Sequence, residues 1–233
     1  MRGYVEGRLA FETTSALMVW EGPAYPQYYI PAKDVLGELR ANGETQHSPS
    51  RGDAEVVNLH LDTIVRESAG RRYPVSPIED IVDHVRFEWD AIDEWLEEDE
   101  PIYTHPRDPY TRVDILQSSR HVRVVVDGVT VADSHSPHIL FETGLPSRYY
   151  LPMSDVRLDL LTPTHSSTHC PYKGTASYWS LNVNGKTYDD LVWTYRTPLP
   201  ESQKIAGLVC FYNEKVELWV DGELEDRPRT KLS

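Results

Sequence analysis

The stretch that decides the fold of this chain is VRVVVDGVTVADS, residues 122–134. Two runs rich in valine flank Asp127-Gly128, and β-branched residues favour strands. An Asp-Gly pair between two such runs is typical of a two-residue hairpin turn, because both turn positions need a positive φ angle. The stretch therefore predicts two antiparallel strands joined by a tight turn.

The pattern around this hairpin occurs twice in the chain of 233 residues. Moved by 121 positions, residues 3–39 align without a gap with residues 124–160. The identical pairs are Gly7 with Gly128, Ser15 with Ser136, Glu21 with Glu142, Tyr28-Tyr29 with Tyr149-Tyr150, Pro31 with Pro152, Asp34-Val35 with Asp155-Val156, and Leu39 with Leu160. With shifts of 122 and 124, residues 47–54 meet 169–176 and residues 85–99 meet 209–223, placing Trp95 on Trp219. Small steps in the shift are what loop insertions produce.

The repeat predicts two homologous domains at residues 1–100 and 119–227, followed by a short tail at 228–233. Residues 101–118 between them, PIYTHPRDPYTRVDILQS, are rich in proline, which favours extended backbone. Arg107 belongs to a run of this linker that alternates charged and aromatic residues. The linker is either a solvated connection or a strap that lies on one domain and closes its cavity.

Each repeat is expected to be all-β with a minor helical content. Asn184-Gly185 predicts a second hairpin and residues 207–223 a third. Helical patterns are confined to residues 153–161 and 200–207, which are too short for the crossovers of a parallel sheet. In the first repeat, DAIDEWLEEDE aligns with a strand segment of the second repeat, so we expect a strand there and not a helix.

Composition narrows the function. There are 37 acidic and 23 basic residues, a formal charge of −14, with no basic patch, so we expect neither nucleic acid nor a membrane surface as a partner. No apolar run reaches the roughly 18 residues of a membrane span. The opening MRGYVEGRLA lacks the apolar core of a signal peptide, and two cysteines suit a reducing compartment. We expect a cytoplasmic monomer or homodimer.

The segment HCPYKG, residues 169–174, carries the most reactive chemistry. A cysteine attacks as a thiolate, and neighbouring cations favour that form. His169 and Lys173 flank Cys170, and a turn shaped by proline and glycine brings Lys173 back toward the sulfur. We predict catalytic roles for these three residues: Lys173 to hold an oxyanion, His169 to carry a proton, and Cys170 as nucleophile. The alternative for Cys170 is a packed side chain in a tight corner.

The first repeat provides an internal control, because it reads HSPSRG at the matching positions 47–52. Ser48 replaces the thiol, whereas Arg51 keeps the positive charge of Lys173. Either the first site is inactive, or the shared task is to bind an anion. Ser50 also replaces the ring of Tyr172, so we expect the larger and better-enclosed pocket beside Lys173.

Aromatic residues surround the motif and could line a cavity. Adjacent residues of a strand face opposite sides, so only one of Tyr178 and Trp179 can line a given pocket, whereas Trp193 and Tyr195 share a side. We predict ligand-binding roles for Tyr150, Tyr172, Trp179, Trp193 and Arg107. We expect neither a metal site nor a cofactor: His165, His169 and Cys170, or His135 and His138, are close in sequence, but Cys-x-x-Cys pairs, nucleotide-binding glycine loops and a nucleophile elbow are missing.

The chain resembles a family known as domain of unknown function 427. The matching segments are VVVDGVTVADS, LFETGLPSRYYLP, HCPYKGTASYW, IAGLVCFY and VELWVDGE, which cover essentially the whole second repeat. The first repeat is similar to a diverged second copy, and HPRDPYTRVDIL resembles the linker of tandem members. The resemblance implies small antiparallel β-domains, barrel- or tent-like, without an established reaction. Some members are labelled nucleotidyltransferase-like, but this chain has no Asp-x-Asp pair to hold Mg²⁺.

Two functions follow from these observations. The first is a binding domain for a small molecule, anionic if Lys173 holds it, or an enzyme of unknown reaction, with its site in the second repeat. The second is a non-catalytic scaffold of two stacked β-domains that recruits another protein. A concave set of aromatic residues would favour the ligand, and a flat exposed set the protein partner.

Overall fold

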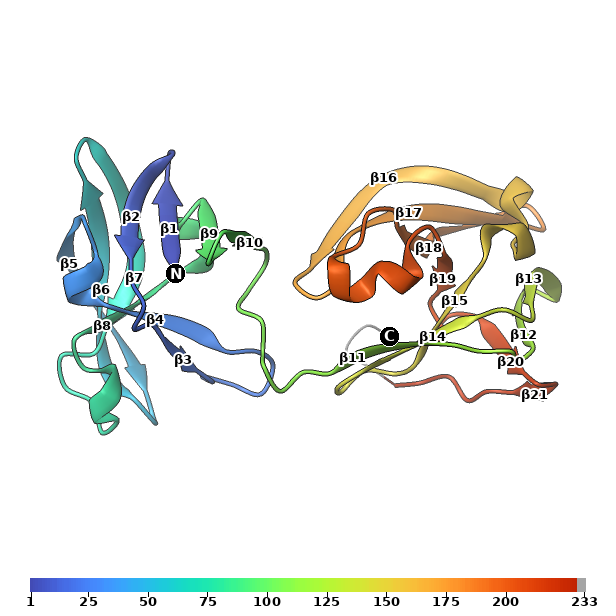
Figure 1. The fold of residues 1–233 in the computed structure, drawn as a ribbon, viewed down its shortest axis with the longest axis horizontal. Helices are drawn as coiled ribbons and strands as arrows, with labels where there is room; N and C mark the ends of the chain where they lie inside the picture. Colours follow the sequence, from blue (N-terminus) through green and yellow to red (C-terminus); the bar gives the residue numbers. More distant parts are fainter. Residues whose placement is uncertain (230–233) are drawn as a thin grey trace. The chain divides into compact units, whose positions relative to one another are not determined.

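The computed structural model describes residues 1–229, so the last four residues of the predicted tail lie outside the described part. The chain divides into two compact units, Met1–Asp108 and Pro109–Ser233, called unit 1 and unit 2 here. Each unit contains two antiparallel sheets (Figure 1). All helices described between residues 1 and 229 are short 3₁₀ turns, and none of them is long and apolar enough to cross a membrane.

Unit 1 has a four-stranded sheet in the order β10-β9-β1-β2 and a six-stranded sheet in the order β3-β4-β8-β7-β6-β5. Its strands are β1 (Arg2–Val5), β2 (Arg8–Glu12), β3 (Leu17–Val19), β4 (Gln27–Pro31), β5 (Glu38–Ser48), β6 (Gly52–Leu61), β7 (Ile64–Arg72), β8 (His84–Phe87), β9 (Glu94–Glu97) and β10 (Glu100–Ile102). Its 3₁₀ turns are η1 (Ala32–Asp34), η2 (Glu79–Ile81) and η3 (Trp89–Ala91).

Unit 2 has a four-stranded sheet in the order β13-β12-β20-β21 and a seven-stranded sheet in the order β11-β14-β15-β19-β18-β17-β16. Its strands are β11 (Val113–Gln117), β12 (Val122–Val126), β13 (Val129–Ser134), β14 (His138–Glu142), β15 (Arg148–Leu151), β16 (Leu161–Cys170), β17 (Gly174–Val183), β18 (Lys186–Tyr195), β19 (Val209–Phe211), β20 (Glu217–Val220) and β21 (Glu223–Leu224). Its 3₁₀ turns are η4 (Met153–Asp155), η5 (Leu158–Leu160) and η6 (Pro200–Ile205). The long strands β16, β17 and β18 are prominent in Figure 1.

The two units have the same strand order, with β1–β10 of unit 1 corresponding to β12–β21 of unit 2. The hairpin predicted from residues 122–134 is β12–β13, and its turn residues Asp127 and Gly128 have φ angles of 47° and 75°. Glu6 and Gly7 repeat this turn in unit 1 with φ angles of 49° and 74°. The all-β prediction is therefore confirmed, and within residues 1–229 the sheets are open and none closes into a barrel.

The short helical segments predicted at residues 153–161 and 200–207 are present as the 3₁₀ turns η4, η5 and η6. Two local predictions need correction. Residues 207–223 do not form a hairpin, because β19 joins the seven-stranded sheet and β20 the four-stranded sheet. Part of the predicted linker is structured, since β11 pairs with β14 from Val113 opposite Glu142 to Gln117 opposite His138. The predicted strand within residues 90–100 is present as β9.

The alignment of Trp95 with Trp219 is wrong by one residue. Trp95 lies opposite Gly3 on β1, whereas the match of Gly3 on β12 is Val124, which lies opposite Leu218. A one-residue slip moves a side chain to the other face of a strand. Trp95 and Leu218 are accordingly buried in the cores, whereas Trp219 packs under the Arg123 guanidinium, 5.0 Å from its ring centre.

Each unit has a main core between its sheets and a smaller cluster on the other face of its large sheet. The smaller cluster of unit 1 consists of Tyr29, Ala54, Tyr73 and Ile81. Their matches Tyr150, Ala176, Tyr195 and Ile205 all belong to the corresponding cluster of unit 2, which is extended by Ile115, Leu140, Tyr178, Trp193 and Cys210. Strand alternation explains both faces, because successive side chains of a strand point to opposite sides.

A second repeated contact ties β13 to the turn after β15. Ser134 Oγ donates a hydrogen bond to Asp155 Oδ2 at 2.6 Å, and Thr13 Oγ1 donates to Asp34 Oδ2 at 2.7 Å in unit 1. Ser134 Oγ also accepts from the Ser136 amide at 3.1 Å. The identical aspartates of the two repeats therefore have one structural role, which is to hold the chain where it enters the long hairpin.

Replacing Ser134 by alanine tests this role. Ser134 is 1% exposed, so the variant leaves the Ser136 amide without its side-chain acceptor and removes the Ser134 donor from Asp155 Oδ2. We expect the free energy of unfolding to fall by about 1–3 kcal/mol in urea titrations. Ser154→Ala is the matched control, because the exposed Ser154 hydroxyl bonds the same carboxylate at 2.9 Å and its loss should cost less than about 0.5 kcal/mol. Equal effects of the two variants would contradict the role.

Candidate functional site

The HCPYKG segment forms the turn between β16 and β17. Gly174, the first residue of β17, has a φ angle of 93°, and Gly52 has 88° at the matching turn of unit 1. This conformation favours glycine over any other residue. The turn is held by the 198–202 segment: the Leu199 amide donates to the Lys173 carbonyl at 3.1 Å, and Ser202 Oγ donates to the Tyr172 carbonyl at 3.0 Å. It buries Lys173 and leaves Cys170 half-buried.

A cavity of about 300 Å³ lies beside this turn, on the face of the large sheet that carries the smaller cluster. Strands β14 to β18 contribute most of its wall. It is lined by Leu140, Glu142, Leu145, Arg148, Tyr150, Thr168, Cys170, Lys173, Tyr178, Trp193, Tyr195 and Tyr212. The site therefore combines an aromatic wall with a small number of charged groups.

Lys173 and Glu142 form an ion pair at the cavity, with Nζ 2.5 Å from Oε2. Each side chain is only 10% exposed. A charge removed from water costs several kcal/mol unless an opposite charge and hydrogen bonds compensate it. The pair as a unit is neutral, and it offers both donors and an acceptor to the cavity.

Arg148 supplies the second buried ion pair. Its two terminal nitrogens each lie 2.7 Å from one oxygen of Glu214, and Nη1 also donates to Asn213 Oδ1 at 3.1 Å. Its guanidinium lies 5.6 Å from the ring centre of Trp193 and 5.8 Å from that of Tyr212. This arrangement of a two-pronged carboxylate contact and aromatic faces holds the side chain rigidly.

Burial keeps three phenol groups of the wall protonated, those of Tyr150, Tyr195 and Tyr212. Burial raises the pKa of Tyr150 well above its usual value, and burial is also the main cause of the raised pKa of Tyr195 and Tyr212. Trp193 Nε1 donates to the Tyr150 hydroxyl at 3.1 Å, and the Tyr178 hydroxyl lies 2.8 Å from Thr168 Oγ1. Tyr150, Tyr195 and Tyr212 are thus uncharged, and hydrogen bonds link the side chains of the aromatic wall.

The two cysteines differ sharply. Cys210 is fully buried beneath the cavity, and burial raises the pKa of its thiol to about 12. Cys170 is half-buried and lines the cavity. If either thiol has a chemical role in the folded protein, it is Cys170.

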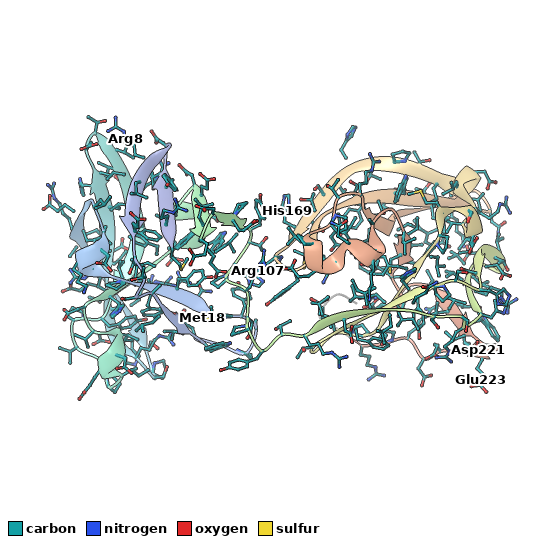
Figure 2. The ribbon with its side chains drawn as sticks, in the orientation of Figure 1. Arg8, Met18, Arg107, His169, Asp221 and Glu223 are labelled. Atoms are coloured by element: carbon teal, nitrogen blue, oxygen red, sulfur yellow. The ribbon has the colours of Figure 1, made fainter. Side chains whose placement is uncertain are left out.

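The structure brings together four of the predicted site residues, because Tyr150, Cys170, Lys173 and Trp193 all line the cavity. His169 does not face it: its side chain is exposed at the end of β16, with Nδ1 2.9 Å from Thr175 Oγ1 (Figure 2).

The remaining predicted residues also lie outside the lining. Trp179 packs against the main core on the opposite face from Tyr178, as the alternation rule requires. Tyr172 lies in the turn next to Lys173, but within the described residues it is not part of the lining. Arg107 belongs to unit 1. The predicted ligand-binding roles of these three residues therefore have no support from the cavity.

Sequence reasoning missed the three residues that complete the two ion pairs of the site: Glu142, Arg148 and Glu214. Glu142 had a usable signal, because its identity with Glu21 in the repeat marks a preserved carboxylate. Arg148 had none, since glutamine stands at the matching position 27. Glu214 had a weaker signal, because the shift of 124 places it on Asp90, another carboxylate.

The matching place in unit 1 is occupied by the protein's own charges. Arg71 and Arg86 lie opposite each other on β7 and β8, as Trp193 and Cys210 do on β18 and β19. Arg86 is 3.8 Å from Glu21, the match of Glu142, and also pairs with Glu88. Side-chain ion pairs thus stand in unit 1 where unit 2 has an aromatic ring and a thiol.

The prediction that the larger pocket lies beside Lys173 is wrong in volume. Unit 1 has two roomier hollows, of about 550 and 470 Å³, near residues 31–33 and 82–84 and near residues 52–55 and 74–77. Neither hollow corresponds to the cavity of unit 2. Of the matching cluster Tyr29, Ala54, Tyr73 and Ile81, only Ala54 lines either hollow. The hollow that includes Arg86 measures about 220 Å³.

Comparison with known proteins gives a family without an assigned activity. A family model described as "Domain of unknown function (DUF427)" matches residues 1–98 and again residues 114–222. A search of the curated proteins found no match. The two matched segments coincide with the two repeats of the fold.

Thiol alkylation tests the burial of the two cysteines. We expect iodoacetamide at pH 8 to modify one thiol of the folded chain, Cys170, because Cys210 is fully buried and remains protonated. Mass spectrometry should show one adduct on the native chain, two in urea, and none on the native Cys170→Ser variant over the same time. Equal labelling of Cys210 and Cys170 in the native chain would show that the smaller cluster is open to solvent.

Proposed function

Because the chain belongs to the DUF427 family, whose description assigns no activity, we propose a function from the cavity alone. Unit 2 is a binding module for a small, flat and mostly apolar molecule with one polar end. Its aromatic wall receives the body of the ligand, and the Lys173–Glu142 pair receives the polar end.

The observation that carries this proposal is the cavity itself. Ligand sites are concave and mostly apolar, with a few convergent polar groups, and their volumes run from roughly 300 to 1,000 Å³. The cavity of about 300 Å³ is at the small end of this range and is lined by Tyr150, Trp193 and three further tyrosines. A small planar body is the shape that such a wall accommodates.

The charge of the ligand follows from the ion pair. A simple anion would draw the Lys173 ammonium away from Glu142, and a carboxylate that is 10% exposed would then lack its partner. Breaking a buried pair in this way costs about 3–5 kcal/mol. A neutral head that both accepts and donates hydrogen bonds, such as a carboxamide, binds with the pair intact. We therefore favour a neutral ligand over the anionic one expected from the sequence.

The scaffold function is less well supported. The aromatic residues around the motif lie in a concave wall, and Tyr150, Tyr178, Trp193 and Tyr195 are all buried. Leu145, which is 44% exposed, is the one strongly exposed large apolar residue of the lining. A flat exposed aromatic patch would favour a protein partner, and this arrangement does not provide one.

The alternative of an enzyme that uses His169, Cys170 and Lys173 is also less well supported. Cys170 and Lys173 share the cavity, but the exposed His169 does not line it, so the predicted proton carrier is not beside the thiol. Lys173 is already engaged by Glu142. We therefore propose binding as the function, and no reaction.

Three probes with the same ring test the proposal: benzamide, benzoate and benzylamine. We expect saturation-transfer NMR and calorimetry on the full chain to show benzamide binding about tenfold more tightly than either charged probe, since hydrogen bonds to charged partners are worth about 1.5–3 kcal/mol. Lys173→Met combined with Glu142→Gln should weaken benzamide binding by a similar factor while avoiding an unpaired buried charge. Arg51→Met, at the matching position of unit 1, and His169→Ala are the controls and should leave binding unchanged.

Other outcomes would overturn parts of the proposal. Tighter binding of benzoate would restore the anionic ligand. Benzamide binding that survives the double substitution would place the site elsewhere. If none of the three probes binds, the scaffold function becomes the better account.

A further inference from the structure

A second site lies on the outer face of the β12–β13 hairpin. We propose that His121, Asp133 and His135 bind a divalent transition-metal ion such as Zn²⁺, through two imidazole nitrogens and one carboxylate oxygen. This inference is independent of the proposed cavity ligand, and it departs from the sequence-based expectation that the chain has no metal site.

The register of the hairpin brings the three side chains together. Val122 pairs with Ser134 and Arg123 pairs with Asp133. Val122 and Ser134 are buried, so alternation turns their neighbours His121, Asp133 and His135 to the outer face. One ligand atom from each of the three residues lies within 4.8 Å of the other two. Residues from the two ends of the hairpin thus share one patch of the sheet.

The groups already contact one another. His121 Nε2 lies 2.6 Å from Asp133 Oδ1, and the His121 and His135 rings stack with their centres 4.2 Å apart at 15°. The start of β12 is fixed because the His121 amide donates to Asp221 Oδ1 at 2.9 Å; Figure 2 labels Asp221 at the turn between β20 and β21. His121 is therefore held by its backbone hydrogen bond, its ring contacts the Asp133 carboxylate, and the His135 ring lies beside it.

Metal binding needs only a local adjustment. Zinc takes imidazole nitrogen and carboxylate oxygen at about 2.0–2.2 Å, so the ligand atoms around a tetrahedral ion stand roughly 3.3–3.5 Å apart. His121 Nε2 and Asp133 Oδ1, now 2.6 Å apart, must separate slightly, and the His135 nitrogen, now within 4.8 Å of them, must take its place beside them. Stacked rings cannot both point their lone pairs at one ion, so the exposed His135 ring must turn about its side-chain bonds. Two histidines and one carboxylate suit Zn²⁺, Ni²⁺ and Cu²⁺, with water in the remaining positions.

The neighbouring arginines Arg120 and Arg123 are engaged by groups other than the Asp133 carboxylate. The Arg123 guanidinium lies over the Trp219 ring at 5.0 Å, and Arg120 Nε lies 2.7 Å from Asp221. Asp133 is therefore engaged by His121 in the part of the chain that the structure describes. Unit 1 has glutamate and threonine at positions 12 and 14, where unit 2 has Asp133 and His135, so the site is specific to unit 2.

Unit 1 offers a natural control, because His47 pairs with Asp53 at 2.6 Å without a second histidine in the pair. We expect calorimetry of the metal-free full chain with ZnCl₂ at pH 7.4 to show one ion per chain, with a dissociation constant in the micromolar range. His135→Ala and Asp133→Asn should each weaken binding more than about tenfold, since even the outer partners of a metal ligand are worth that factor. His47→Ala should leave binding unchanged.

A spectroscopic readout separates this site from adventitious zinc. Cu²⁺ added at one equivalent should give an electron paramagnetic resonance spectrum with coupling to two nitrogens, reduced to one in His135→Ala. The proposal is overturned if zinc binds more weakly than about 1 mM. It is also overturned if His135→Ala binds as tightly as the unchanged chain, or if His47→Ala loses the ion instead. The side chains of His47, His121, Asp133 and His135 are partly or fully exposed, so circular dichroism should confirm that the variants remain folded.

Discussion

A charged side chain that leaves water must meet an opposite charge, and the face of each large sheet that carries the smaller cluster is built around this constraint. Strand alternation sends one set of side chains into the main core and the other set to this second face. In unit 2 that face contains Lys173 with Glu142 and Arg148 with Glu214, each ion pair closed and largely buried. The aromatic wall can approach these charges because the pairs are neutral as units.

The two units satisfy the same constraint in different ways. They share a glutamate, two tyrosines and a basic residue at matching positions: Glu21, Tyr29, Tyr73 and Arg51 in unit 1, and Glu142, Tyr150, Tyr195 and Lys173 in unit 2. They differ where Arg71 and Arg86 of unit 1 are replaced by Trp193 and Cys210. The arginines of unit 1 bring extra charge to its carboxylates, whereas in unit 2 the uncharged Trp193 ring lines the cavity and the Cys210 thiol is buried. This replacement is the physical basis for assigning the ligand to unit 2.

The sequence predicted the repeat, the all-β class and the hairpin turns, because turn residues and β-branched runs act locally. It placed Cys170 and Lys173 correctly at a turn, and alternation separated Tyr178 from Trp179. It could not find Arg148, which has no match in the other repeat, or the one-residue slip at Trp95, because both depend on strand register. The histidines of the outer face were missed for the same reason: only pairing between strands brings them together.

The most direct test of the account is a crystal structure of the full chain soaked with benzamide. The account predicts density for the probe in the cavity of unit 2, with its ring against Tyr150 and Trp193 and its carboxamide at the Lys173–Glu142 pair. It predicts no probe among Arg71, Arg86 and Glu21 of unit 1. A probe bound at that place in unit 1, or a cavity in unit 2 that is closed by its own side chains, would contradict the central claim.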